Sequence, residues 1–393
     1  MSLLSLAVAA CCIVVAIRRQ AGLGWGLLGA FAFLAQPASA EWVGLHRVDS
    51  LALALTLGGL VAAQRGRIVL AALLCGLSVL SKQTYLAAPL AISVWLLLDG
   101  RRRDTARFVV AFGLPLAVVG LALELATGGN FLRHVVGANL NPFSAALVLD
   151  WIGWATRLSG PLLVAGLVGV LVLPRSWWLW KLYFAFTVPN VLALGKDGAS
   201  FNYWFEPLAA AGILGAGALA FVFARRPMMA LAATGAVFLA VAPSAASTGA
   251  AARLSALRAT ADRPAVDWAV DAARRAPGDV LSEDLAITAL AGKPLAFEYV
   301  IYSILWTEGL WREDQLVADL DQGRYSHLIL LGDEDPLAGD CLCMPPPVWD
   351  ALRRNYGRID SSGRYVLYQF QPVAAAAGDY TAATKAREPF GEE

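Results

Sequence analysis

Long apolar stretches alternate with short charged or turn-rich segments along the first 246 residues of the chain. A helix of about 20 apolar residues crosses the hydrocarbon core of a bilayer, and shorter ones are tolerated beside protein or a cavity. The pattern therefore predicts about ten membrane spans, near residues 3–18, 22–40, 50–63, 68–81, 84–98, 108–127, 158–173, 177–195, 203–224 and 227–246.

The pattern changes after residue 246. Alternating "GDVLSED" and "SHLILLG" predict strands, "RPAVDWAVDAARRA" and "PPVWDALRRNYG" predict amphipathic helices, and "IDSSGRYVLYQF" predicts a closing hairpin. The expected fold class is mainly α: a polytopic transmembrane helical bundle over residues 1–246, with a small C-terminal α/β domain over 247–372. The Ala-rich and then charged segment 373–393 is expected to be a disordered tail.

Composition supports the membrane assignment. The chain is 58% hydrophobic and 16% charged, with a mean hydropathy of +0.59. A soluble domain of 393 residues could not bury that much apolar surface, which excludes a soluble enzyme. Cys341 and Cys343 are too close for an ordinary disulfide and have no further metal-ligand partners nearby, so a zinc site is not expected there.

Basic residues are unevenly divided between alternate loops. One set of loops carries 12 Lys and Arg residues and the other carries 5, namely Arg47, Lys82, Arg133, Arg157 and Lys196. The positive-inside rule places the first set in the cytoplasm, so the C-terminal domain is expected outside the cytoplasmic (inner) membrane. From residue 247 onward the chain has 14 basic and 22 acidic residues, and this acidic balance argues against nucleic-acid binding.

Four polar patches fall on the expected extracytoplasmic side. They contain the cations, carboxylates and amides of that side: Glu41, His46, Arg47 and Asp49; Lys82 and Gln83; Arg133, His134, Asn139 and Asn141; and Lys196, Asp197, Asn202, Tyr203 and Glu206. Charge at membrane depth is costly, so such residues need a partner, a water-filled cavity or a function.

Each patch also has a purely structural explanation. Asp49 precedes an apolar helix and could cap it, while Lys82 and Lys196 could extend to the interface. Tyr85 and Tyr203 could belong to an interfacial aromatic belt, and Asn202 could be a turn residue.

Taken together, cations, carboxylates and aromatic residues at one membrane face favour the binding of a phosphate-bearing lipid that reacts outside. Lys and Arg would hold the leaving phosphate, and an acid would take a proton from an acceptor hydroxyl. A Ser-His-Asp or metal-dependent hydrolase is disfavoured, because the only histidines are His46, His134 and His327 and none has ligand spacing.

Several segments resemble a known family. "HRVDSLALALTLGGL", "AALLCGLSVLSKQTYLAAPLAI", "GKDGASFNYWFEPLAA" and "VLSEDLAITALAGKPLAFE" are similar to multispanning glycosyltransferases of the GT-C type. The nearest branch is the bacterial relatives of protein O-mannosyltransferases and lipid A aminoarabinose transferase. The resemblance covers most of residues 15–370. It implies a polyprenyl-phosphate-linked sugar donor and inverting transfer to an extracytoplasmic lipid, glycan or protein acceptor.

The resemblance also places an acid lining the active cavity at Asp49. We expect Asp49 and Arg47 to be catalytic, and a second group to bind substrate: Glu41, His46, Lys82, Gln83, Lys196, Asp197, Asn202, Tyr203 and Glu206. No metal site is assigned, and a divalent cation stays open as a cofactor.

Two features depart from the family pattern. The family places its main catalytic Asp in the first extracytoplasmic loop, and this sequence contains no such loop after a first helix. With about ten spans both ends would lie outside, although no basic residue precedes the first helix. We therefore expect one or two further helices upstream, and expect the 393-residue form to transfer no sugar.

Two other functions compete with the transferase. A lipid or polysaccharide transporter would need a polar track through the membrane and paired broken helices, whereas the polar residues here gather on one side. A non-catalytic membrane partner would be compatible with the missing loop.

The division of basic residues predicts the side of the C-terminal domain. The loop charges predict that residue Gln371 lies outside the cytoplasm. A reporter that works only outside the cytoplasm should therefore be active when fused after Gln371, and a reporter that works only in the cytoplasm should be inactive. Paired fusions of alkaline phosphatase and a cytoplasmic fluorescent protein measure this. Activity of the cytoplasmic reporter alone would contradict the orientation.

Overall fold

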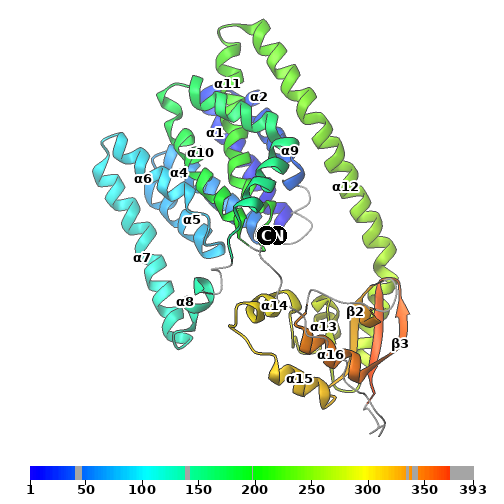
Figure 1. Ribbon diagram of the computed structural model, residues 1–393. Coiled ribbons are helices and arrows are strands. Elements are labelled where there is room, and N and C mark those ends of the chain that lie inside the picture. Colours follow the sequence, from blue (N-terminus) through cyan, green and yellow to red (C-terminus); the bar gives the residue numbers. More distant parts are fainter. Residues whose placement is uncertain (40–46, 138–141, 197, 333–335, 339–343, 372–393) are drawn as a thin grey trace. The chain divides into compact units, whose positions relative to one another are not determined.

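The chain forms two compact units, Met1–Ser255 and Ala256–Glu393. The structure is a computed structural model that describes residues 1–39, 47–137, 142–196, 198–332, 336–338 and 344–371. The described chain is mainly helical, with a four-stranded sheet near the C-terminus (Figure 1). The coarse fold class expected from the sequence is thus confirmed, while the number of spans and the domain limits stay predictions.

The first unit is a bundle of apolar helices (Figure 1). Its α-helices are α1 (Ser2–Ala21), α2 (Leu23–Leu34), α4 (Asp49–Gln64), α5 (Ile68–Ser81), α6 (Ala87–Leu98), α7 (Arg102–Ala126), α8 (Asn130–Val135), α9 (Ala145–Val172), α10 (Trp178–Leu192) and α11 (Phe205–Phe223). Short 3-10 turns join the later helices: η2 (Arg175–Trp177), η3 (Ala193–Gly195) and η4 (Phe201–Trp204).

Four segments of the described chain are long and apolar enough to cross a membrane: Ser2–Ala21, Arg102–Ala126, Ala145–Val172 and Phe201–Phe223. The apolar helices α2, α4, α5 and α6 are shorter. Segment Phe201–Phe223 is mostly buried within the unit, whereas α7 exposes most of its apolar side chains. α7 therefore has the surface expected of a lipid-facing helix, and α11 that of a central one.

Small residues let α11 approach its neighbours closely. α11 packs against α9, α2 and α1. A Cβ atom placed on Gly169 of α9 would lie 2.5 Å from the carbonyl oxygen of Leu214, and one on Gly166 would lie 2.7 Å from Cα of Ala211. Such contacts are typical of helix pairs in membranes, where close packing replaces the hydrophobic effect as the source of association.

Two helices differ from the spans predicted by hydropathy. α9 begins at Ala145, whereas the hydropathy pattern predicted a span beginning near residue 158. The charges of Asp150 and Arg157 suggested a loop, but both side chains are exposed on the surface of the helix, which therefore continues through them. α12 (Pro227–Arg275) continues for 49 residues through the expected end of the last span at 246. A helix of that length measures about 73 Å, more than twice the hydrocarbon thickness of a bilayer. The two compact units divide within α12.

The second unit contains a sheet with strand order β1-β2-β4-β3. β1 (Asp279–Ser282) runs parallel to β2 (Tyr325–Leu331), and β4 (Tyr365–Phe370) runs antiparallel to both β2 and β3 (Tyr356–Ser362). Its further helices are α13 (Leu285–Ala291), α14 (Tyr299–Thr307), α15 (Asp314–Asp321) and α16 (Pro346–Asn355), with the turn η5 (Pro336–Ala338).

Alternate residues of this sheet pack on opposite faces. Leu328 and Val366 pack in a core with Leu352 of α16, whereas Ile329 and Leu367 pack with residues of α12 and α13. This is the two-residue period of a strand covered on both faces. The structure confirms the strands, the amphipathic helices and the hairpin predicted for this part of the chain. Cys341, Cys343 and the predicted tail 373–393 lie outside the described residues.

Close packing at Gly169 of α9 and open space at Gly120 of α7 predict opposite effects when each glycine is replaced by alanine. Gly169→Ala should lower the free energy of unfolding by about 1–3 kcal/mol, because the methyl group meets the backbone of α11. Gly120 of α7 has no atom within 4 Å of such a methyl group, so Gly120→Ala should raise the free energy of unfolding by about 0.5–1 kcal/mol. Thermal unfolding in detergent measures both, and equal shifts would contradict the packing.

Candidate functional site

Asp49 lies at the start of α4 and is the centre of a buried polar cluster. The residue is only 3% exposed. Val48 is the N-cap residue of α4, so Asp49 does not occupy the N-cap position. Instead, Lys82 forms an ion pair with Oδ1 of Asp49, and Asn202 donates from Nδ2 to the same oxygen over 2.7 Å. Helix capping alone therefore does not account for the contacts of this acid.

Three distant segments converge on this carboxylate. Asp49 begins α4, Lys82 follows the last residue of α5, and Asn202 lies in η4 directly before α11. Lys82 adopts an extended backbone conformation, which ends α5 and turns the chain away from the helix. Segments 33 and 153 residues apart thus supply the two donors to Asp49.

Hydrogen bonds between α4 and α5 fix the position of Lys82. Thr56 and Ser78 are both buried and lie 2.7 Å apart through their hydroxyl oxygens. The Ser78 hydroxyl lies 2.8 Å from the carbonyl oxygen of Ala52, one turn along from Asp49. Because buried hydroxyls are costly without partners, this network holds the two helices in one register.

Aromatic rings surround the Lys82 ammonium group. Nζ of Lys82 lies 4.8 Å from the ring centroid of Tyr203 and 5.9 Å from that of Tyr85. The Tyr85 hydroxyl donates to the backbone carbonyl of Asp49 over 3.2 Å, and Tyr85 is buried. Lys82 therefore does not simply extend to the interface, and Tyr85 is not part of an exposed aromatic belt. The cation is stabilised by a carboxylate and by ring faces.

Glu206 is a second buried carboxylate near this cluster. It lies in the first turn of α11 and is 3% exposed. Asn190 donates to Oε2 over 2.8 Å, and the Tyr183 hydroxyl donates to Oε1 over 3.2 Å. The charge of Lys82 also acts on this carboxylate. The unit thus buries two acids from different helices, each held by hydrogen bonds from side chains of other segments.

The other residues expected at the site have different positions. Arg47 and Gln83 are exposed, and the backbone carbonyl of Arg47 accepts a hydrogen bond of 3.5 Å from Ser2. Lys196 is partly buried, and its backbone forms a bridge with Phe143. Glu41, His46 and Asp197 lie outside the described residues. Of the expected set, the structure brings together Asp49, Lys82, Asn202 and Tyr203, with Glu206 near Lys82.

Other members of the expected patches lie elsewhere. Arg133 and His134 lie on α8 and are exposed, and Asn139 and Asn141 fall outside the described residues. Among the described residues, no group of three or more His, Cys, Asp or Glu side chains could hold a metal ion.

Two partners of Glu206 were missed by sequence reasoning. Tyr183 and Asn190 both lie on α10, about two helical turns apart. Both side chains donate to Glu206 of α11, so they lie on the face of α10 that packs against α11. The only available signal was a polar amide near the end of an otherwise apolar helix, in "FTVPNVL". Such an amide at membrane depth needs a hydrogen-bond partner, which Glu206 provides.

The fold has solved relatives. No family model matches the chain, and no curated protein matches it. A crystal structure of ArnT from Cupriavidus metallidurans bound to undecaprenyl phosphate is similar, with a TM-score of 0.61 and 17% identity over 96% of this chain and 84% of that one. The apo structure of the same protein gives a TM-score of 0.63 and 16% identity over the same shares. The chain therefore has the fold of ArnT, the GT-C architecture that its motifs resembled.

Proposed function

We propose that the chain is a membrane glycosyltransferase that moves a sugar from a polyprenyl-phosphate-linked donor to an extracytoplasmic acceptor. The observation that carries the proposal is the buried contact of Asp49, Lys82 and Asn202 inside the apolar unit. A carboxylate and an ammonium group at this depth are expensive to maintain, and such groups in membrane segments usually serve function. We therefore propose Asp49 as the residue at the reacting centre.

Lys82 is the proposed contact for the donor phosphate. An ammonium group has three N–H donors, and the contacts with Asp49 and Tyr203 hold it in one place. A phosphate oxygen arriving beside it would form a charge-assisted hydrogen bond, which is stronger than a neutral one. The similar ArnT structure that contains undecaprenyl phosphate supports this class of donor.

The chemical step would be an in-line displacement. The acceptor oxygen forms a bond to the anomeric carbon of the sugar, the bond from that carbon to the phosphate oxygen breaks, and the polyprenyl phosphate leaves with the electron pair. The acceptor proton passes to a carboxylate, and inversion at the anomeric carbon follows from the single displacement. Asp49 would take the proton or position the acceptor, with Asn202 holding the carboxylate in place.

Holding the acceptor hydroxyl beside Asp49 lowers the activation barrier of the displacement only if the Asp49 carboxylate keeps a fixed orientation. Asn202 and Tyr85 hold the side chain and the backbone of Asp49 respectively. Glu206 is held by Tyr183 and Asn190, and would contact sugar or acceptor beside Tyr203. Side chains locked by such neighbours maintain the geometry that a displacement requires.

The remaining expected residues complete the proposal. Arg47 and Lys196 would contact the donor phosphate, and Glu41, His46, Gln83 and Asp197 would contact substrate. The protein would lie in the cytoplasmic membrane, with residues 247–372 outside it, where that domain covers the cavity or recruits the acceptor. The sugar and the acceptor are to be identified by assay.

The role of Asp49 is tested by a nearly isosteric change. Asp49→Asn should lower sugar transfer by a factor of about 100 or more, because the amide cannot accept the acceptor proton. Transfer from a radiolabelled polyprenyl-phosphate sugar to candidate acceptors measures this in a purified form extended upstream, because the 393-residue form is expected to transfer no sugar. Asp150→Asn is the matched control, since Asp150 is exposed on α9 and belongs to no part of the proposed site. Normal transfer by folded Asp49→Asn protein would remove Asp49 from catalysis.

The ion pair itself is tested by a double-mutant cycle. Asp49→Asn and Lys82→Met should each destabilise the fold, because each leaves a charged or polar partner buried without its counterpart. The double variant should lose less than the sum, with a coupling free energy above about 1 kcal/mol. Equilibrium unfolding in mixed micelles measures the four proteins. Additive losses would mean that the two side chains do not stabilise each other.

A further inference from the structure

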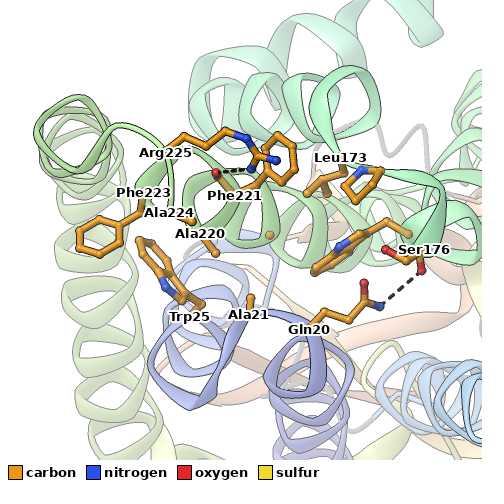
Figure 2. A pocket seen from close by; sticks show the side chains of 13 residues that line it. Gln20, Ala21, Trp25, Leu173, Ser176, Ala220, Phe221, Phe223, Ala224 and Arg225 are labelled. Atoms are coloured by element: carbon orange, nitrogen blue, oxygen red, sulfur yellow. Dashed lines mark hydrogen bonds between the residues drawn. The ribbon is translucent and has the colours of Figure 1, made fainter.

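A cavity lies at the C-terminal end of α11, whereas Asp49 lies near the start of that helix (Figure 2). It has a volume of about 560 Å³, and the residues that matter most in its lining are Gln20, Trp25, Ser176, Trp177, Phe221 and Arg225. α11 begins beside Asn202 and ends at Phe223, a separation of about 27 Å along the helix. The cavity is thus independent of the polar cluster around Asp49.

Several basic residues neighbour the cavity lining in the sequence, and Arg225 is part of the lining itself. α1 carries Arg18 and Arg19 in its last turn, just before Gln20 in the lining. Arg225 and Arg226 follow the end of α11, and Arg175 lies in η2 beside Ser176. By the positive-inside rule this membrane face is the cytoplasmic one, where anionic phospholipid headgroups attract arginine.

Arg225 is held over the cavity in a defined orientation. Its guanidinium carbon lies 3.6 Å from the centroid of the Phe221 ring, and Nη1 donates to the Phe221 carbonyl over 3.1 Å (Figure 2). A guanidinium group has five N–H donors in a planar fork that matches a phosphate group in a bidentate manner. Stacking on a ring restricts the side chain before a ligand arrives, which lowers the entropic cost of binding.

The rest of the lining combines aromatic and polar groups. Trp25 packs edge-on against Phe223 with ring centroids 5.7 Å apart, and Trp177 is buried against Gly217, where a Cβ atom would lie 2.6 Å from the indole. On another side, Gln20 donates to the Ser176 carbonyl over 3.5 Å (Figure 2). Tryptophan with adjacent polar groups is typical of the level of lipid headgroups.

One effect opposes an anion at this place. The C-terminus of α11 lies at this region, and its helix dipole contributes roughly half a negative elementary charge there. The guanidinium of Arg225 carries a full positive charge within the same turn. The positive charge is the larger of the two, so the local balance favours a negatively charged ligand.

We propose that this cavity binds the phosphate headgroup of an anionic phospholipid. Arg225 would hold the phosphate, Gln20 and Ser176 would face the glycerol portion, and the acyl chains would lie along the exposed apolar side chains of Leu23, Leu27 and Phe223. The volume is within the range of specific small-molecule sites, which is about 300–1,000 Å³, and is sufficient for a phosphoglycerol headgroup.

Native mass spectrometry of the full chain in non-ionic micelles tests the proposal. Phosphatidylglycerol should be retained in preference to phosphatidylcholine with the same acyl chains. Arg225→Gln should weaken phosphatidylglycerol binding by about tenfold, because a charge-assisted pair is lost. Arg226→Gln is the matched control: Arg226 is the next residue, is exposed and does not line the cavity.

A second variant tests the cavity without changing charge. Ala220→Phe fills space in the lining and should abolish the preference while Arg225 stays in place. Thermal unfolding without lipid checks that each variant folds. Equal loss in the Arg225 and Arg226 variants, or unchanged binding by Ala220→Phe, would overturn the site. Displacement of the lipid by excess inorganic phosphate alone would overturn the lipid assignment and leave a site for free anions.

Discussion

The structure of the membrane unit depends on placing two charges of opposite sign inside an apolar helical bundle. An unpaired carboxylate or ammonium at this depth would cost several kcal/mol, and a direct contact with further hydrogen bonds offsets that cost. Asp49, Lys82 and Asn202 meet these conditions. Because they come from the start of α4, the end of α5 and the turn before α11, their contact fixes the relative positions of all three segments.

The packing around α11 makes this convergence possible. Gly166 and Gly169 allow α9 to pack closely against the backbone of α11. Gly29 allows α2 to do the same, because a Cβ atom there would lie 2.9 Å from the carbonyl oxygen of Gly212. With α11 held centrally, its first turn carries Glu206 toward Tyr183 and Asn190 of α10. Opposite ends of the same helix thus meet two different environments: a polar cluster with carboxylates and an arginine-bearing cavity.

Much of the fold follows from local sequence patterns. Runs of apolar residues located α1, α5, α6 and α11, and two-residue alternation located β1 and β2. α9 and α12 were placed less well, because hydropathy treats exposed charges such as Asp150 as breaks, whereas a helix keeps them on one face. The residue types and their position beside apolar helices identified Asp49 and Lys82 as candidate site residues. Their pairing could not be predicted, because it depends on tertiary packing between helices. The same is true of Tyr183 and Asn190, whose partner lies on another helix.

The central claim is that Lys82, held by Asp49, receives the phosphate of a polyprenyl donor. A cryo-electron microscopy structure of the full chain in lipid nanodiscs with polyprenyl phosphate tests it most directly. We expect the phosphate within hydrogen-bonding distance of Nζ of Lys82, with Asp49 and Asn202 still in contact beside it. A phosphate bound away from Lys82, with the pair of Asp49 and Lys82 undisturbed, would contradict the account.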